Sequence, residues 1–239
     1  MNRHHESGFT LTELAIVLAI VTLLVGGMLI PISAQYDARY VSDTQRQLNE
    51  AREALIGFVI ANGYFPCPAD ATSSGLEAGV PVRNAVTNQC TNRVGLLPWA
   101  TLGITRLDSW GRQFHYSVAK TFTDNSTLPS PSFALTATGD ITIKGEAAVS
   151  LTNAGSVAAV ILSNGKNGIL GVTDSGTTIP NSSATNTDEQ ENGNATGTTF
   201  HDRIATTDPA ANGGEIDDIL VWIPTYTLMN KLVAARKLP

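Results

Sequence analysis

The chain has 239 residues, a formal net charge of -6 and 15% charged residues, with 21 glycines but only 6% aromatic residues. This mild acidity, without any basic stripe, argues against a nucleic-acid partner. The abundance of Gly, Ser, Thr and Asn favours a loop-rich, exported domain that contains β-structure over a helical bundle.

A short polar leader, residues 1–8, precedes a long apolar run, and no charged residue occurs from Leu14 through Tyr36. At about 1.5 Å per residue, a helix of this length crosses the roughly 30 Å of hydrocarbon in a bilayer. No small-residue cleavage site follows the run, whereas Gly8 precedes it, so a cut there would leave the apolar helix attached. We therefore predict a single transmembrane helix over residues 9–32.

The sequence that begins at Gly8 reads G-F-T-L-T-E. It resembles the processing signature of type IV prepilins and type II secretion pseudopilins, in which the same motif stands before an uncharged run. The resemblance implies that a prepilin peptidase cuts between Gly8 and Phe9 and methylates the new amino group of Phe9. It also implies an α+β, pilin-like fold, in which a long N-terminal helix packs on an antiparallel β-sheet head with long loops.

Glu13 stands at the edge of the apolar run. The Leu, Ile and Val residues between Leu14 and Ile30 favour membrane insertion by about 5 kcal/mol, whereas an acidic side chain in the membrane costs several kcal/mol. After cleavage, the cationic amine of Phe9 in one subunit could pair with Glu13 of a neighbour and fix the register of the two helices. We interpret Glu13 as an assembly residue; the alternative is a carboxylate solvated at the membrane interface.

Residues 33–62 continue the helix with apolar positions at near-helical spacing and charged residues between them. We expect this amphipathic periplasmic helix to lay its apolar stripe on a globular, β-rich head over residues 63–239. The dipeptide Asn62-Gly63 is a typical C-terminal stop.

Within the head, β-branched runs predict an antiparallel sheet, because they follow one another without intervening helices. The predicted strands are residues 133–138, 141–144, 147–151, 157–162 and 219–223. The segment at 108–116 resembles a pseudopilin element in which a turn leads into a strand, and we place its Phe114 on the same face as its Tyr116. From its polar composition, the segment between Asn164 and Gly214 is predicted to be an exposed, mobile loop.

The two cysteines, Cys67 and Cys90, flank a segment rich in Pro, Gly, Ser and Asn. In an oxidising compartment they would close a loop of about two dozen residues, which is worth roughly 3 kcal/mol. We predict this disulfide; the alternative is a pair of separately buried thiols.

The two ends of the polar segment carry the candidate cofactor site. Residues 163–168 before it and 213–219 after it resemble the paired elements that hold calcium in the major pseudopilin. Because calcium takes six or more oxygen ligands, carbonyl groups together with Asp217 and Asp218 could supply a site. The alternative is a solvated strand-entry turn in which Asp217 faces water, with no cofactor bound.

The sequence contains no nucleophile elbow, P-loop, dinucleotide-binding or zinc-protease motif, so we predict no enzymatic activity. The predicted function is a structural subunit, a minor pilin or pseudopilin, of a type IV pilus or type II secretion filament. Its expected partners are prepilin peptidase, other pilin or pseudopilin subunits and inner-membrane lipid. We expect a bacterial inner-membrane location with the head in the periplasm, or a place in an assembled periplasmic or extracellular filament. The rival hypothesis is a membrane-tethered periplasmic binding module that does not assemble.

Overall fold

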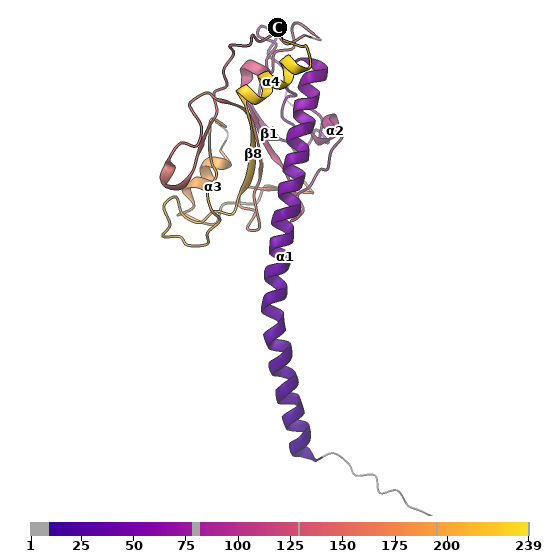
Figure 1. Ribbon diagram of the computed structural model, residues 1–239, viewed down its shortest axis with the longest axis vertical. Helices are drawn as coiled ribbons and strands as arrows, with labels where there is room; N and C mark the ends of the chain where they lie inside the picture. The colour runs from indigo at the N-terminus through magenta and orange to yellow at the C-terminus, as the bar shows by residue number, and fades with distance from the viewer. Residues whose placement is uncertain (1–9, 78–81, 129, 195, 239) are drawn as a thin grey trace, which may run out of the picture. The chain divides into compact units, whose positions relative to one another are not determined.

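The structure is a computed structural model that describes residues 10–77, 82–128, 130–194 and 196–238, without the side chains of residues 26–33. The helices are α1 (Leu11–Asn62), α2 (Trp99–Leu102), α3 (Thr187–Asn192) and α4 (Thr225–Ala234), and two 3-10 helices are η1 (Lys120–Phe122) and η2 (Glu146–Ala148) (Figure 1). The strands are β1 (Val94–Leu96), β2 (Arg112–Gln113), β3 (His115–Val118), β4 (Thr142–Lys144), β5 (Val157–Ser163), β6 (Val172–Thr173), β7 (Thr199–His201) and β8 (Ile219–Pro224). The chain divides into two compact units, Met1–Tyr40 and Val41–Pro239, and each is described by itself.

The first unit contains the amino-terminal part of α1. Its large apolar side chains between Leu11 and Val25 are exposed. Among the described residues, no helix has an apolar stretch long enough to span a bilayer. The predicted span of residues 9–32 begins at Phe9 and includes side chains from Gly26 onward, and these lie outside the described residues.

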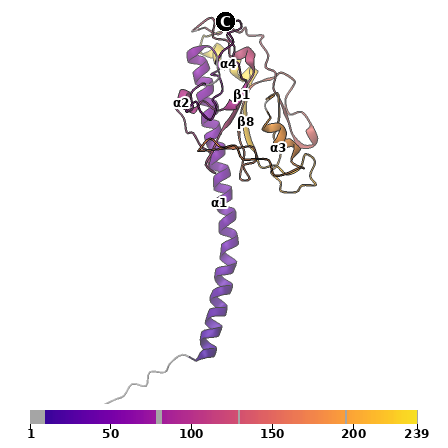
Figure 2. The same ribbon diagram turned by 180° about the vertical axis from the view of Figure 1, so that it is seen from behind.

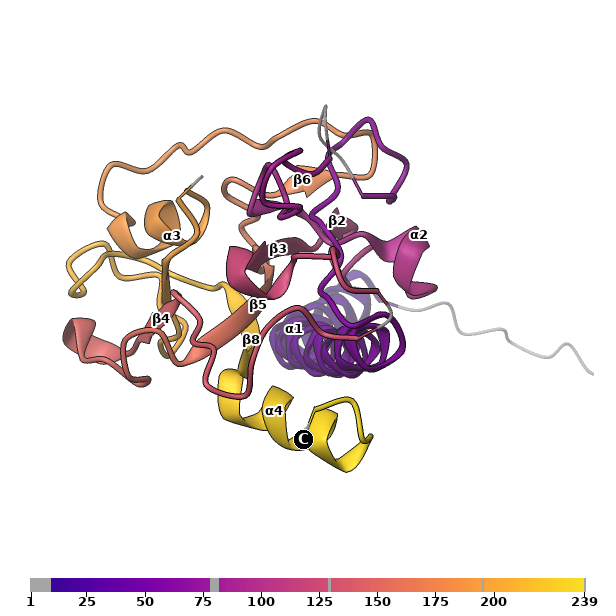
Figure 3. The same ribbon diagram turned by 90° about the horizontal axis from the view of Figure 1, so that it is seen from above.

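The second unit is organised by a four-stranded sheet with the strand order β1-β3-β5-β8. All three pairings in this sheet are antiparallel, which confirms the predicted α+β class and sheet direction. The seven residues of the central strand β5 are all buried. Figure 3 shows why: the α1 residues of this unit lie on one face of the sheet, and β4 and α3 lie on the other.

The larger core lies between the sheet and α1. Leu48, Leu55 and Val59 recur at helical spacing and are fully buried, as the amphipathic pattern predicts. Phe114 and Tyr116 from the predicted turn–strand element belong to the same core. Three residues of α4, Leu228, Met229 and Leu232, complete this core.

The amphipathic helix ends where its sequence predicts. The N–H of Gly63 donates a 2.7 Å hydrogen bond to the carbonyl oxygen of Val59. Gly63 has a positive φ of 86°, a conformation that glycine adopts at helix ends without steric cost. The chain therefore turns back immediately after Asn62 and enters the head.

The smaller core lies on the opposite face of the sheet, against the β4–β7 pair. Ile143 of β4 and Phe200 of β7 pack on Val160, Leu162 and Leu220 from the sheet. β4 and β7 pair in parallel, unlike the strands of the main sheet. Figure 2, seen from behind, shows α3 on the side of β8 away from α1.

Two of the predicted strands are wrong. Residues 133–138 form turns and irregular structure, and Phe133 instead packs edge to face on Phe122 with ring centroids 5.0 Å apart. Residues 147–151 begin in the 3-10 helix η2, where Ala147 and Ala148 both have positive φ. β-branched residues alone did not predict a strand correctly at either place, because strand formation also depends on packing against neighbouring strands.

The predicted mobile loop between Asn164 and Gly214 is also wrong. This segment contains β6, α3 and β7, and its polar residues Glu189, Asn192 and His201 are buried. Polar side chains are tolerated in the interior when they form hydrogen bonds with one another.

Cys67 and Cys90 are joined by a disulfide, with their Cα atoms 5.4 Å apart. Both residues are buried, and the bridge ties the segment after α1 to the segment before β1. The N–H of Cys90 donates a 3.0 Å hydrogen bond to the hydroxyl of Thr123, so the bridged loop is also anchored by a hydrogen bond.

Candidate functional site

The first described turn of α1 places Glu13 in a reciprocal cap. The N–H and the hydroxyl of Thr10 donate hydrogen bonds of 2.9 and 2.8 Å to Glu13 Oε2, and the N–H of Glu13 lies 3.3 Å from Thr10 Oγ1. This is a capping box, which satisfies N–H groups that the first helical turn leaves without partners. The T-x-x-E spacing could have predicted this cap, which is neither the intersubunit pair nor the solvated interfacial carboxylate that was expected for Glu13. Gly8 and Phe9, the predicted processing positions, lie outside the described residues.

The helix after this cap presents apolar side chains to its surroundings on every side. The exposed side chains are Leu11, Leu14, Ile16, Val17, Leu18, Ile20, Val21, Leu23, Leu24 and Val25. An exposed apolar surface this continuous marks a site of interaction with lipid or with another protein.

The head carries a second candidate site, a cluster of three carboxylates. One oxygen from each of Glu189, Asp217 and Asp218 lies within 4.8 Å of the others, so the group could hold a metal ion. Asp217 and Asp218 immediately precede β8, whereas Glu189 belongs to α3. Glu189 is 1% exposed and Asp218 is 7% exposed, so two of the three carboxylates are almost fully withdrawn from water.

Hydrogen bonds hold each carboxylate in place. Glu189 Oε1 accepts bonds from the side chain of Asn167 at 2.8 Å and from the N–H of Asp217 at 3.0 Å. Asp217 Oδ2 accepts a 2.8 Å bond from the N–H of Asn167, and Asp218 Oδ2 accepts a 2.8 Å bond from the side chain of Asn192. The other oxygens, Asp217 Oδ1 and Asp218 Oδ1, are buried and have no hydrogen-bond partner among the described residues.

The carboxylates perturb one another electrostatically. Burial raises the pKa of Asp217 to about 6, and the nearby charge of Glu189 adds to the rise. Burial also raises the pKa of Asp218 well above its ordinary value, with the charges of Glu189 and Asp217 acting in the same direction. Buried carboxylates that lie close together repel one another when all are ionised. A bound proton or a bound cation would therefore stabilise the cluster.

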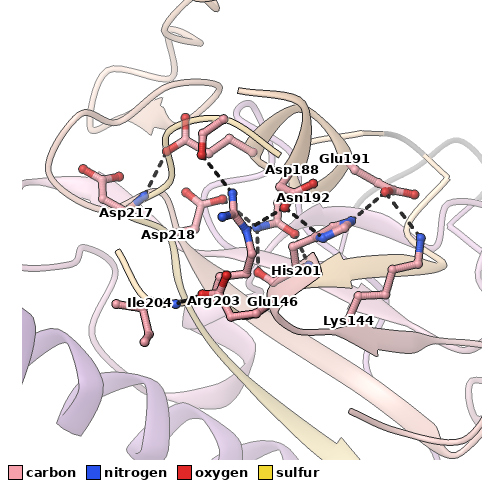
Figure 4. Close-up of polar contacts among 12 residues, drawn as sticks. Lys144, Glu146, Asp188, Glu191, Asn192, His201, Arg203, Ile204, Asp217 and Asp218 are labelled. Carbon is pink, nitrogen blue, oxygen red and sulfur yellow. Dashed lines mark hydrogen bonds and ion pairs between the residues drawn. The ribbon is translucent and has the colours of Figure 1, made fainter. Parts of the chain in front are cut away.

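Asn192 connects this cluster to a second layer of buried polar groups (Figure 4). Its side chain accepts a 2.6 Å bond from the N–H of His201 and donates to the His201 carbonyl oxygen at 3.1 Å. His201 Nε2 lies 2.7 Å from Glu191, and His201 Nδ1 lies 3.2 Å from Asp188. Arg203 Nε lies 2.6 Å from the same Asp188 oxygen. This layer fixes the position of Asp218 through Asn192.

The structure brings together the two segments that the sequence analysis named, residues 163–168 and 213–219. The two segments approach each other closely at Gly165, which has a positive φ of 57°. A Cβ atom at this position would lie 2.2 Å from the carbonyl oxygen of Asp217. Only a residue without a side chain fits there. Asp217 and Asp218 lie together beside Glu189, which the sequence did not predict because its polar surroundings are typical of a solvated loop.

Comparison with known families identifies the amino terminus. Residues 3–29 match the prokaryotic N-terminal methylation motif, which includes Gly8, Phe9, Thr10 and Glu13. The chain carries a prepilin-type amino terminus. This match, which covers the amino-terminal segment alone, supports membership of the type IV pilin and pseudopilin family. No curated protein and no solved structure matches the chain.

Proposed function

We propose that this chain is a structural subunit, a minor pilin or a type II secretion pseudopilin, that assembles into a filament through the amino-terminal part of α1. The observation that carries the proposal is the methylation motif at residues 3–29, which includes the exposed apolar side chains between Leu11 and Val25. In this proposal, residues 1–8 are the leader and 9–32 the membrane and filament-core helix. Residues 33–62 are the amphipathic periplasmic helix, and 63–239 form the head.

Processing would convert this amino terminus from a storage form into an assembly form. Prepilin peptidase would cut between Gly8 and Phe9 and methylate Phe9, while the apolar helix keeps the subunit in the inner membrane with its head in the periplasm. Before assembly, Thr10 satisfies the Glu13 carboxylate within the same chain. In the filament, the cationic amine of Phe9 from a neighbour would approach this carboxylate in apolar surroundings, where an ion pair fixes register.

Three single variants, expressed in cells that lack the native chain, test the assembly role. Glu13→Ala removes the carboxylate, and Thr10→Ala removes the hydroxyl of the cap but keeps the charge. Glu50→Ala is a matched control at an exposed helix position, where Glu50 pairs with Arg46. We expect Glu13→Ala to abolish incorporation into filaments, and the other two variants to assemble. Loss in both Glu13→Ala and Thr10→Ala would indicate that helix capping matters, and not intersubunit pairing.

The rival function, a membrane-tethered periplasmic binding module that does not assemble, makes the opposite prediction. Under it, Glu13→Ala would leave function intact, because the carboxylate would serve no contact between subunits. Unchanged assembly or secretion in that variant would therefore contradict our proposal.

We further propose that the carboxylate cluster binds calcium and thereby stabilises the head. The support is the pair of buried oxygens, Asp217 Oδ1 and Asp218 Oδ1, that lack hydrogen-bond partners among the described residues. Calcium prefers such oxygens, and carbonyl groups or water would complete its six to eight ligands. The Asn, Asp and Glu side chains around this cluster offer oxygen atoms, which are the ligands that suit calcium, and they offer none of the thiolate ligands that suit zinc.

The melting temperature of the fragment that starts at residue 35 tests calcium binding. At a calcium concentration 100 times the dissociation constant, binding would add about 2.7 kcal/mol to the free energy of unfolding. Asp218→Asn should remove the shift, whereas Asp208→Asn, at an exposed loop position, should retain it. Equal melting temperatures in calcium and in chelator would contradict calcium binding and leave the assembly proposal untouched.

A further inference from the structure

The outer edge of β8 borders a groove with a volume of about 710 Å³. β8 is the last strand of the sheet, and within the described residues no strand or bridge pairs with its outer edge. Figure 3 shows β8 at the end of the sheet, beyond β5. Its six residues extend over about 20 Å, at about 3.4 Å per residue, and present unpaired backbone N–H and C=O groups to the groove.

The groove has two walls that rise on either side of this edge. One wall is a stripe of α1 that contains Val41, Gln45, Asn49, Arg52, Glu53 and Ile56. The other wall is the segment after β7, with Asp202, Arg203 and Ala205. A single extended chain that added to this edge would lie between these walls.

The usual protections of an edge strand are weak in β8. Natural edge strands carry charged residues, proline or bulges that prevent pairing with other chains. β8 reads I-L-V-W-I-P, so it contains no charged residue, and its proline stands only at the last position. An edge of this composition, kept accessible in a groove, is typical of proteins that bind peptides by strand addition.

The groove is lined by four acidic side chains and three basic ones, which are Glu53, Asp202, Asp217, Asp218, Arg52, Lys166 and Arg203. This excess of carboxylates favours a cationic occupant. Arg203 is neutralised by Asp188, at 2.6 Å, and its guanidinium also donates to the Gly214 carbonyl oxygen. Asp202 is half-buried, and its carboxylate has no hydrogen-bond or ion-pair partner among the described side chains. A carboxylate left in this way beside an open edge attracts a cationic group.

From these contacts we propose that the β8 edge is a docking site for an extended segment of another protein, with alternating apolar residues and a Lys or Arg that pairs with Asp202. The segment would add to the sheet as a fifth strand. Backbone hydrogen bonds to β8 supply affinity, and the two walls read alternate side chains. This function of the head goes beyond filament assembly through α1 and does not depend on it.

A peptide with a fluorescein group in place of an acetyl cap, fluoresceinyl-Lys-Val-Thr-Val-Thr-Val-amide, tests the proposal on the full chain in detergent. In strand addition, only every second N–H of the peptide bonds to β8. We therefore expect that N-methylation of one alternating set of residues abolishes binding, whereas N-methylation of the other set leaves binding unchanged. Hydrogen exchange should show new protection confined to β8. The proposal would be overturned if N-methylation of either set weakened binding equally, or if the peptide did not bind at millimolar concentration.

Variants of the wall locate the site and test its charge. Ala205→Trp fills the groove from an exposed position and should abolish binding, whereas Ala210→Trp, also exposed but outside the groove, should bind normally. Asp202→Asn should weaken binding by up to about fivefold, the upper end of the range for a partly exposed ion pair. Tighter binding of the same peptide with Glu in place of Lys would overturn the charge assignment. A peptide-independent dimer that Ala205→Trp dissociates would overturn the choice of occupant in favour of a second copy.

Discussion

Asn192 is the side chain on which the buried polar layer of the head depends most directly, and Asn192→Ala tests this. The substitution removes the 2.8 Å bond to Asp218 and both bonds to the backbone of His201. A buried backbone N–H and a buried carboxylate then lose a partner, and each such loss costs about 1–3 kcal/mol. We expect the free energy of unfolding to fall by about 3–5 kcal/mol.

Urea unfolding of the fragment that starts at residue 35, monitored by tryptophan fluorescence, measures this loss. Asn212→Ala is the matched control, because Asn212 is exposed, and it should change the free energy of unfolding by less than about 0.5 kcal/mol. In an Asp218→Asn background, Asn192→Ala should cost less, because the two side chains are bonded and their effects are not additive. A loss below about 1 kcal/mol for Asn192→Ala would refute the reasoning, since it would mean that water replaces these bonds without penalty.

Three further predictions concern the head. Replacing Cys67 and Cys90 by Ser opens a loop with a sequence separation of 23 residues. Urea unfolding should show that the free energy of unfolding falls by about 3.4 kcal/mol. Equal stability of the variant and the oxidised protein would contradict this. Without calcium, the free energy of unfolding should fall as the pH rises from about 4 through about 6, because the folded pKa of Asp217 is raised and folding therefore favours its protonated form. Asp217 contributes at most about 3 kcal/mol of this fall, and the neighbouring Asp218, whose pKa burial also raises, adds to it. Asp217→Asn should therefore make the fall smaller without removing it; an unchanged fall in that variant would refute the assignment to Asp217. Gly165→Ala should cost about 2 kcal/mol in urea unfolding, more than Gly103→Ala, because both glycines have positive φ but only Gly165 meets a neighbouring atom; equal losses would contradict the role of that contact.

The parts of the fold that the sequence predicted are those in which apolar residues recur with a regular period. Leu48, Leu55 and Val59 identify the buried face of α1, and the apolar run at residues 157–162 identifies the central strand β5. In both cases burial of apolar surface decides the structure, and that preference can be read from neighbouring residues alone. The methylation motif is likewise local, so it could be recognised without the fold.

The residues that the sequence analysis missed are buried by contacts between distant parts of the chain. Glu189 bonds to Asn167 and Asp217, which lie 22 and 28 positions away, and Asn192 bonds to Asp218, 26 positions away. Polar composition predicts exposure, because an isolated polar group loses free energy when it leaves water. That cost is offset only when complementary groups meet in the folded chain, and no local pattern around Glu189 shows that they do.

The start of β8 connects the two proposals for the head. Asp218, whose Oδ1 atom has no hydrogen-bond partner among the described residues, is followed directly by Ile219, the first residue of the open strand. A cation on the cluster would hold the backbone at Asp217 and Asp218, and so it would order the end of the edge on which an incoming strand must pair. Ordering that has already taken place lowers the entropic cost of the second binding event. Linkage then requires that a docked strand raise the affinity for the cation by the same factor.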